Sequence, residues 1–436
     1  MNEPDTTPLD RYLKSLELLA RSEAVIPLGS QTFSKSRTTL PVGTSPLFAE
    51  RGLGSHIWDV DGNEYVDFVS GLLAISLGYR DDDVDSAVLE QMQKGTLFSL
   101  PHRIETEVAE LIVELVPCAE LVRFGKNGSD ATSGAIRIAR AYTKRDRVAV
   151  CGYHGWQDWY IGSTTRDLGV PETTKELTHK FEYNNARSLG ELLDGHRGEF
   201  AAVILEPMNV AWPEEGFLEE VQRLAHDHGA LLVFDETITG FRFAMGGAQE
   251  LFGVIPDLAT FGKGVANGHP LSIVTGRREY MRLMEDVFFS FTFGGEALSL
   301  AAAKAVIAKM RRLPVLDTIH RQGQKVLDGL AERIARHGVG GFCRVAGHPA
   351  WSFFTMTDAA PFSAYELKTF FLQEMFARGI LVIGSHNMSF AHSDADVARL
   401  LTAYDEILPM LGEAVKQGDL RERLLSDPLV PLFSVR

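Results

Sequence analysis

Polar residues that could do chemistry follow directly after several short apolar runs of this sequence. Lys263 stands between two glycines after the run 258–261, and a lysine removed from water has a lowered pKa and can act as a nucleophile. Asp235 follows the run 230–234, where a buried carboxylate needs a cationic partner. That partner could be the protonated ring nitrogen of a ligand or the cation of an ordinary salt bridge, and the residues alone leave both open.

Two further groups could bind an anion and a planar ligand. Gly128 and Ser129 open a predicted helix, and the free backbone N–H groups at the start of a helix bind anions such as phosphate. Tyr153 and His154 follow the run 147–151, where a ring could stack on a planar ligand. An ordinary helix cap and a pair of core aromatic residues are the competing interpretations.

The sequence does not match the familiar motifs for nucleotide-binding and metal-binding sites. A phosphate-binding P-loop ending at Lys263 would need glycine where Asp257 stands and Ser or Thr where Gly264 stands. His226 and His228 are two residues apart, so on a helix they cannot share a metal ion. We therefore expect no metal site.

The elements that must position these residues alternate between apolar runs and helical patterns. Runs without polar interruptions are typical of strands covered on both faces, and strand–helix alternation predicts a mostly parallel α/β sheet. Ligands of such sheets bind beyond the carboxyl ends of the strands, where the polar groups above are found. The predicted strands are residues 121–124, 147–151, 201–205, 230–234, 258–261 and 271–275, with helices over residues 131–144 and 218–228.

Both chain ends have a different pattern. Asp61 and Gly62 stand between apolar pairs and predict a hairpin turn. After about residue 310 the sequence predicts a smaller α+β domain. Its expected elements are helices over residues 315–337 and 394–411 and strands over residues 351–355 and 381–383. We predict three parts: an N-terminal segment (1–85) that packs on the small domain, a large domain (86–310) and the small domain itself (311–436).

Composition excludes several classes of protein. The 436 residues are 45% hydrophobic and 23% charged, which is typical of a globular chain. A net charge of −15 argues against a protein that coats nucleic acid or an anionic membrane. The sequence has no apolar run of membrane-spanning length, its first ten residues do not resemble a secretory signal, and its three cysteines lie far apart. We expect a cytoplasmic protein.

Taken together and in order, these motifs resemble those of the fold-type I enzymes that use pyridoxal 5'-phosphate (PLP). The resemblance extends from about residue 26 to about residue 397 and is closest to class III aminotransferases of the glutamate-1-semialdehyde 2,1-aminomutase group. The matching stretches are WDVDGNEYVDF, RFGKNGSDATSGAIRIARAYT, GYHGWQD, VILEP, LLVFDETITGFR, PDLATFGKG and TFGGEALSLAA. The resemblance implies the fold-type I architecture, PLP as cofactor, and a homodimer with shared active sites.

Family roles then fall on individual positions of this chain. The resemblance implies that Lys263 forms the Schiff base with PLP and moves the proton, while Asp235 keeps the pyridine nitrogen protonated. It places Glu206 near the phenolic oxygen of the ring or the substrate amine.

The remaining cofactor roles concern the phosphate and the face of the ring. The resemblance implies that Gly128 and Ser129 hold the phosphate, and that Tyr153 stacks on the ring with His154 beside it. Thr292 would reach the phosphate bound by the neighbouring subunit.

The departures from the aminomutase pattern fall on the substrate side. Lys35, with Arg37 nearby, stands where the aminomutases have a carboxylate-binding arginine, and Leu72 replaces a tryptophan. A late acidic residue is missing from the stretch that contains His386 and Asn387. These two residues and Trp156 are further candidates for contacts with the acceptor.

We therefore expect an aminotransferase that moves an amino group from an amino acid, glutamate by family habit, to a small polar ketone of a cyclic or sugar-like kind on a biosynthetic route. The alternative is an intramolecular aminomutase with Lys35 as a weaker carboxylate anchor than arginine. A cofactor-free scaffold is a third interpretation, against which the intact Lys263 and Asp235 argue.

Overall fold

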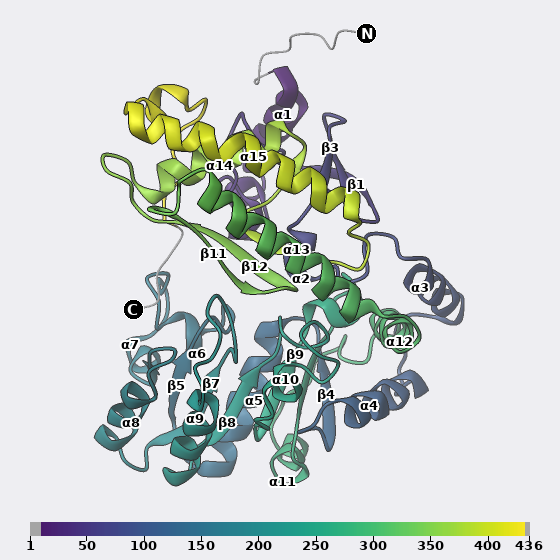
Figure 1. Cartoon of the computed structure of the whole chain (residues 1–436). Coiled ribbons are helices and arrows are strands. Elements are labelled where there is room, and N and C mark those ends of the chain that lie inside the picture. The colour runs from purple at the N-terminus through teal and green to yellow at the C-terminus, as the bar shows by residue number, and fades with distance from the viewer. Residues whose placement is uncertain (1–9, 432–436) are drawn as a thin grey trace. The chain divides into compact units, whose positions relative to one another are not determined.

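The apolar runs form the strands of a seven-stranded sheet in the computed structural model, which describes residues 10–431. The strand order is β4-β10-β9-β8-β7-β5-β6, and neighbours are parallel except at β10, which is antiparallel to β4 and β9 (Figure 1). The strands are β4 (Leu121–Gly125), β5 (Arg147–Cys151), β6 (Thr178–Lys180), β7 (Phe200–Leu205), β8 (Leu231–Asp235), β9 (Leu258–Phe261) and β10 (Ser272–Gly276). The expected mostly parallel sheet is confirmed, and the short β6 is its one strand that was not predicted.

Helices cover both faces of this sheet because alternate residues of each buried strand point to opposite sides. Val148 and Val150 of β5 pack with α5 in one core cluster, whereas Ala149 and Cys151 pack with α8 and α9 in another. The helices of this part of the chain are α3 (Asp82–Lys94), α4 (Arg103–Leu115), α5 (Gly128–Thr143), α6 (Asp158–Ile161), α7 (Glu172–Lys175), α8 (Ala186–Gly195), α9 (Phe217–Asp227), α10 (Ala248–Phe252), α11 (Arg278–Met281) and α12 (Ala297–Arg312).

The strand register brings the chemistry-bearing residues to one edge of the sheet. Cys151 at the end of β5 pairs with Leu205 at the end of β7, and Leu205 pairs with Phe234 of β8. Asp235 then pairs with Thr260 of β9. The carboxyl ends of β5, β7, β8 and β9 are therefore aligned, and the residues that follow these strands lie at the same edge of the sheet.

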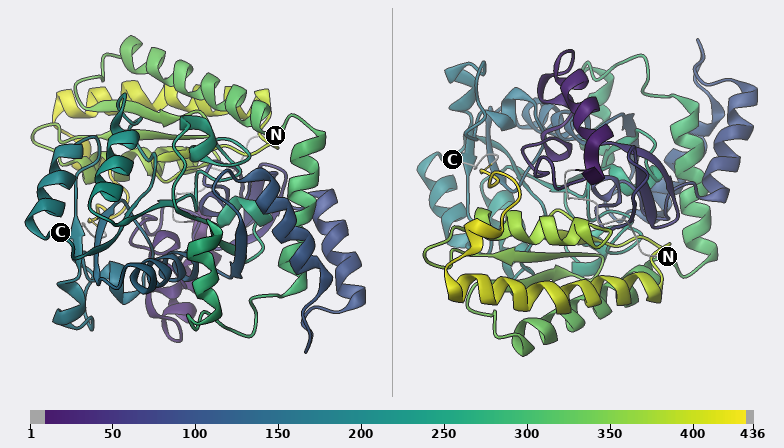
Figure 2. Two further views of the ribbon diagram at one scale, coloured as in Figure 1. Left: turned by 90° about the horizontal axis from the view of Figure 1, so that it is seen from below. Right: turned by 90° about the horizontal axis from the view of Figure 1, so that it is seen from above.

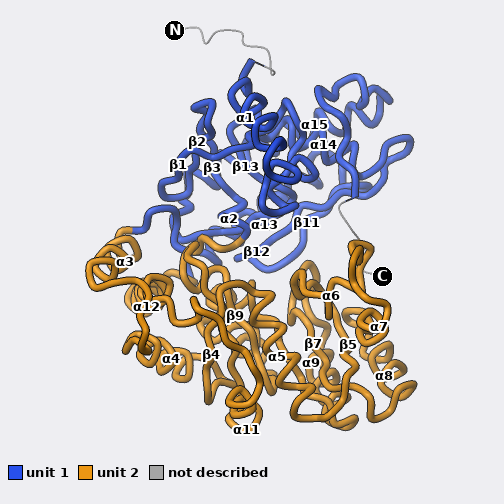
Figure 3. Tube along the Cα trace, turned by 180° about the vertical axis from the view of Figure 1, so that it is seen from behind, with its two compact units in different colours: residues 1–72, 77–81, 317–432 blue, residues 73–76, 82–316, 433–436 orange. Residues whose placement is uncertain are grey.

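The chain divides into two units, which are coloured separately in Figure 3. The large unit contains the seven-stranded sheet and consists of residues 73–76 and 82–316. The terminal unit consists of the described residues of 1–72, 77–81 and 317–432. Residues 73–76 are a short piece of the large unit between two stretches of the terminal unit.

The terminal unit contains a four-stranded sheet, β1-β2-β3-β13, and a three-stranded sheet, β11-β12-β14. Strands β2 and β3 are antiparallel and joined through Asp61 and Gly62, as the hairpin prediction requires. Helix α14 packs against α15 and β12 within this unit (Figure 2). The strands are β1 (Ala49–Leu53), β2 (His56–Asp59), β3 (Glu64–Asp67), β11 (Cys343–His348), β12 (Trp351–Met356), β13 (Ile380–Leu381) and β14 (Ser385–Asn387). The helices are α1 (Leu13–Glu23), α2 (Ser70–Leu73), α13 (Val315–Arg336), α14 (Ala364–Ala377) and α15 (Asp394–Gln417), of which Leu73 and residues 315–316 belong to the large unit.

Two predicted boundaries of the terminal unit differ from the structure. Helix α15 continues beyond residue 411 because Ala414 extends its buried face. Strand β13 ends at Leu381 because only Ile380 and Leu381 pair with β3. Within residues 10–431, no helix combines the length and apolar composition needed to cross a lipid bilayer.

Candidate active site

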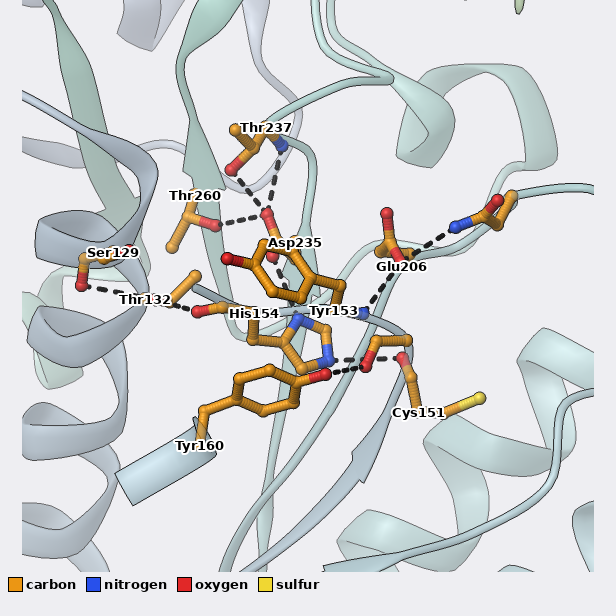
Figure 4. A network of polar contacts seen from close by, with 12 residues as sticks. Ser129, Thr132, Cys151, Tyr153, His154, Tyr160, Glu206, Asp235, Thr237 and Thr260 are labelled. Atoms are coloured by element: carbon orange, nitrogen blue, oxygen red, sulfur yellow. Dashed lines mark hydrogen bonds and ion pairs between the residues drawn. The ribbon is translucent and has the colours of Figure 1, made fainter. Parts of the chain in front are cut away.

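One cavity of the large unit collects residues from the loops that follow β4, β5, β7, β8 and β9. Its volume is about 540 Å³. Among its lining residues are Gly128, Ser129, Tyr153, His154, Trp156, Glu206, Asp235 and Lys263, together with Ala74, Lys126, Thr237 and His269. The structure thus brings together most of the predicted cofactor-binding residues, and Figure 4 shows the polar network that joins several of them.

The start of α5 forms the anion-binding side of this cavity. Asn127 caps the helix by accepting from the Asp130 N–H at 3.1 Å, and the Asp130 carboxylate accepts from the Lys126 and Asn127 N–H groups at 3.0 Å. This capping box does not use the N–H groups of Gly128 and Ser129, which have no acceptor within the helix because they belong to its first turn. They are available to an anion at the positive end of the helix dipole.

The Ser129 hydroxyl is held in place by the next loop. Its Oγ accepts from the Trp156 N–H at 3.2 Å. Gly155 has a φ of +106°, and a Cβ at this position would collide with Ser129 Oγ. Glycine is therefore needed at residue 155 for the loop to approach the start of α5 so closely.

Asp235 is buried at the end of β8 and receives hydrogen bonds from three side chains (Figure 4). Thr237 donates to Oδ1 from its N–H at 3.1 Å and its hydroxyl at 2.6 Å, and the Thr260 hydroxyl donates to the same oxygen at 3.2 Å. His154 Nδ1 lies 2.9 Å from Oδ2. Burial alone would raise the pKa of Asp235, but the hydrogen bonds from His154 and Thr237 outweigh burial and hold that pKa below its ordinary value. The carboxylate is therefore anionic at neutral pH.

His154 lines the cavity next to Asp235. Its ring is buried, and its Nε2 lies 3.2 Å from the carbonyl oxygen of Cys151. Both ring nitrogens therefore lie within hydrogen-bond distance of an oxygen, and the contact with Asp235 suits a residue that supports this carboxylate.

Glu206 follows β7 and is buried on another side of the cavity. Its Oε2 accepts from the Tyr153 N–H and from Asn209 Nδ2, both at 3.0 Å. Gly152 packs against this carboxylate, since an added Cβ would lie 2.5 Å from Oε2. Burial, and then the nearby charge of Asp235, raise the pKa of Glu206.

Replacing Glu206 by glutamine should stabilise the cofactor-free protein at neutral pH. Because the folded-state pKa is raised, the folded state binds more protons than the unfolded state, and stability falls as pH rises above the ordinary pKa of 4.5. Glutamine carries no charge, so the loss of stability above this pH is removed. We therefore expect Tm at pH 8 to rise by about 2–4 °C, the change that ~1 kcal/mol makes in a large domain. Thermal unfolding at pH 8 and at pH 4.5 or below tests this, since an equal shift at both would contradict the electrostatic cause.

Lys263 begins the 3₁₀ turn Lys263–Ala266 directly after β9 and lines the same cavity as Asp235 and Glu206. Its φ is +46°, in the left-handed region that side chains other than glycine rarely adopt. Burial lowers the pKa of Lys263, and the charges of Glu206 and Asp235 act in the opposite direction. A larger fraction of this amine is therefore neutral and nucleophilic than for an ordinary lysine.

Two aromatic side chains on the cavity wall remain open to solvent. Tyr153 is 48% exposed and Trp156 is 64% exposed, although both follow the buried strand β5. The Tyr153 ring stands edge-on to Tyr160, with ring centroids 5.5 Å apart. A tyrosine ring on the wall of a cavity can stack on a planar ligand.

Thr292 belongs to the large unit but does not line this cavity, and its side chain is exposed. The substrate-side candidates Lys35 and Leu72 belong to the terminal unit, where both line a mainly apolar cavity of about 210 Å³. Arg37 is also in the terminal unit and is paired with Glu23 at 2.6 Å.

His386 and Asn387 have the surroundings of core residues of the terminal unit. Both are buried in β14. His386 is hydrogen-bonded to Ser352 at 3.0 Å and to Tyr404 at 2.8 Å, and burial lowers its pKa to about 3. Asn387 donates to the Val69 carbonyl at 2.7 Å. These bonds within the unit use both ring nitrogens of His386 and one N–H of the Asn387 amide, whose buried Oδ1 has no hydrogen-bond partner among the described residues.

Sequence reasoning missed several residues of the site. Thr237 could have been found, because a threonine two residues after a buried aspartate commonly bonds to it. Thr260 follows from the sheet register, which pairs it with Asp235. Asn209, which donates to Glu206, and Ala74, which lines the cavity, carry no signal in the sequence.

The donor set of the cavity fits PLP. The N–H groups of Gly128 and Ser129 suit its phosphate, the anionic Asp235 suits a protonated ring nitrogen, and the amine of Lys263 suits its aldehyde. The cavity volume of about 540 Å³ is within the range of small-molecule sites.

Comparisons with known proteins agree with this chemistry. A family model described as class-III aminotransferase matches residues 39–394. A 3-aminobutyryl-CoA aminotransferase of Cloacimonas acidaminovorans is 34% identical over 408 residues, which cover 91% of this chain and 97% of the other. A glutamate-1-semialdehyde 2,1-aminomutase of Alkaliphilus oremlandii is 37% identical over 424 residues, covering 91% and 98%.

Solved structures give the same result. The FumI protein of Sphingopyxis sp. MTA144, in its PLP internal aldimine form, superposes with a TM-score of 0.86 at 29% identity, covering 95% of this chain and 99% of that one. An omega-transaminase from Sphaerobacter thermophilus superposes with a TM-score of 0.81 at 26% identity, covering 94% and 99%.

Proposed function

The chain belongs to the class III aminotransferases, enzymes that use PLP, and on this premise we propose that it transfers an amino group from an amino acid donor to a separate carbonyl acceptor. The observation that carries the proposal is the single cavity that holds Lys263, Asp235 and the start of α5. We propose glutamate as the donor and a small polar ketone as the acceptor.

We assign a role to each cavity residue on this basis. Lys263 holds PLP covalently through Nζ and afterwards carries the proton between the carbon and nitrogen atoms of the substrate. Asp235 holds a proton on the pyridine nitrogen, and His154 supports the Asp235 carboxylate through its 2.9 Å contact. Gly128 and Ser129 bind the phosphate.

When bound, PLP supplies an aldehyde that takes up an amino group and a ring that takes up electrons. Tyr153 would orient the ring by stacking on it, and Glu206 would lie toward the phenolic oxygen or the substrate amine. In the first half-reaction the amino group of the donor is replaced by a carbonyl oxygen. In the second half-reaction the carbonyl oxygen of the acceptor is replaced by an amino group. The reaction is therefore balanced without an external oxidant or reductant.

Thr292 supports the proposal of a homodimer with shared sites. It is exposed and lies between Phe291 and Phe293, near Phe288, which is 78% exposed. Exposed apolar side chains gathered in one loop are typical of a surface that another subunit covers. We propose that Thr292 completes the phosphate site of a second copy; light scattering that gives only the 48.1 kDa mass of one chain would contradict this.

An intramolecular aminomutase is the second candidate, because relatives named glutamate-1-semialdehyde 2,1-aminomutase match nearly the whole chain. Lys35 bears on the choice. It lines the small, mainly apolar cavity of the terminal unit with Leu72, and a lysine cannot bind a carboxylate with the two parallel hydrogen bonds of an arginine. This difference favours the two-substrate reaction.

Addition of glutamate alone to the PLP-loaded enzyme should release one 2-oxoglutarate per subunit and remove the visible absorbance of the bound cofactor. The reaction should stop there, because no acceptor is present to take the amino group. Rapid-quench analysis with the absorption spectrum measures both quantities. The matched control is glutamate-1-semialdehyde alone: its continuous turnover without a second substrate would favour the aminomutase. No release of an oxo acid from any common amino acid would contradict the aminotransferase.

A further inference from the structure

The short piece of the large unit between the two stretches of the terminal unit, residues 73–76, is tied to the rest of the large unit by three hydrogen bonds. Arg242 Nη2 donates to the Leu73 carbonyl at 3.0 Å. Ser76 Oγ donates to the Gly264 carbonyl at 2.8 Å, and the Ser76 N–H donates to Asn267 Oδ1 at 3.0 Å. Arg242, Ser76 and Asn267 are all buried. We call residues 73–76 the brace.

The brace holds the turn that carries Lys263. Lys263 and Asn267, at either end of this turn, have φ values of +46° and +45°. Left-handed residues other than glycine are strained and persist only where their surroundings impose this conformation. Ser76 bonds to the carbonyl of Gly264, the residue after the lysine, and a Cβ at Gly264 would lie 3.4 Å from the Ser76 Cβ. The brace therefore packs directly against the turn.

The stretch that leads into the brace has an unusual backbone conformation. Ser70, Gly71, Leu72 and Leu73 have successive φ values of 48°, 57°, 60° and 70°. Consecutive left-handed residues are rare because each non-glycine residue brings its Cβ too close to the following carbonyl oxygen. The buried guanidinium of Arg242 anchors Leu73 at the end of this stretch, and the next residue, Ala74, lines the cavity. One short segment thus forms part of the cavity wall and supports the lysine turn.

We propose that Ser76 is a positioning residue for Lys263, acting through its hydrogen bond to the Gly264 carbonyl, with Asn267 and Arg242 holding the brace in place. This inference rests on the proposed function, in which the Lys263 amine binds PLP covalently. A reacting amine must be held close to its attack geometry, because displacements of about 1 Å cost up to ~10²-fold in rate. The Ser76 bond limits such displacement in a turn that is otherwise strained.

The test is the rate at which the PLP-free enzyme captures PLP covalently, followed by borohydride reduction at timed intervals and mass spectrometry of the Lys263 peptide. We expect Ser76→Ala to slow capture by about five- to tenfold, the effect of one lost buried hydrogen bond. Asn267→Gly keeps the left-handed backbone available but removes the acceptor of the Ser76 N–H, so capture should slow in the same direction. Asn267→Gly serves as the test variant if Ser76→Ala does not fold.

Ser272→Ala is the matched control. Ser272 is an equally buried serine of the large unit, and its Oγ has no hydrogen-bond partner among the described residues. Ser272→Ala also removes a serine hydroxyl, but it breaks no hydrogen bond to another described residue. We expect this variant to capture PLP at the wild-type rate.

A second comparison separates positioning from general loss of structure. In a Lys263→Ala background PLP binds only non-covalently, so Ser76→Ala should leave its affinity unchanged, since the bond acts through the lysine turn. The inference is overturned if Ser76→Ala captures PLP at the wild-type rate, or if it weakens PLP binding in the Lys263→Ala background as well. If the wild-type enzyme forms no adduct at Lys263, the proposed function itself fails, and the two failures are thereby distinguished.

Discussion

Lys263→Ala should remove the covalent attachment of PLP and reduce transamination by about 10³–10⁴-fold, the upper range for loss of a group that transfers a proton. Lys263 lines the cavity with Asp235 and Glu206, and burial lowers the pKa of its amine, so it is suited both to bond the cofactor and to act as a base. PLP should still bind, because the start of α5 and Asp235 are untouched. Borohydride reduction followed by peptide mapping detects the loss of the adduct.

A matched lysine variant keeps this result interpretable. Lys304 lies on α12 and pairs with Glu107 at 2.6 Å, outside the cavity, so Lys304→Ala should retain both the adduct and the activity. A small primary amine added to Lys263→Ala should restore part of the activity by supplying the missing base. If Lys263→Ala kept full activity, or if the adduct formed at another lysine, the assignment of Lys263 would be wrong.

Asp235→Asn should lower the rate of amino transfer by about 10²–10³-fold, the range observed when one preorganised electrostatic group is removed. The carboxylate is anionic because the hydrogen bonds from His154 and Thr237 hold its pKa below the ordinary value despite burial. Asparagine has nearly the same shape but no charge, so it cannot hold a proton on the pyridine nitrogen. Covalent attachment at Lys263 should persist, and single-turnover measurements with glutamate should show a slower removal of the proton from the substrate.

Asp257 offers a control of the same kind in the same unit. It is buried, lies 2.8 Å from His226 Nε2 and accepts from the Leu232 N–H at 2.8 Å, but it does not line the cavity. Asp257→Asn should lower Tm while leaving the rate per bound cofactor unchanged. Equal losses of rate in the two variants would mean that Asp235 acts through stability alone.

The gathering of the predicted cofactor-binding residues in one cavity could be predicted because it depends on local order along the chain. Asp235 ends an apolar strand, and Ser129, Tyr153 and Lys263 come shortly after one. The carboxyl ends of parallel strands lie at one edge of a sheet. The strands themselves were recognisable because full burial requires uninterrupted apolar runs. Neither the position of these residues nor the identity of the strands requires the order of the strands in the sheet.

The orientation of His154 could not be predicted in this way. His154 follows Tyr153 in sequence, but its side chain is buried and contacts Asp235, whereas the Tyr153 ring is 48% exposed. Successive residues of an extended segment point in opposite directions, and only the packing of the loop decides which of them is buried. The surroundings of His386 have the same origin, because Ser352 and Tyr404 lie far from it in sequence.

The sequence by itself determined the sheet, the family and the groups that can bind PLP, since these depend on residue types and spacing within short stretches. Only the tertiary structure decided what holds those groups in place: the His154 contact with Asp235, the burial that shifts the pKa values of Glu206 and Lys263, and the bond from Ser76 to the lysine turn. Ser76 and Gly264 are 188 residues apart, and no local pattern encodes a pairing over such a distance. Supporting contacts of this kind arise when the folded chain excludes water and each buried polar group must find a partner.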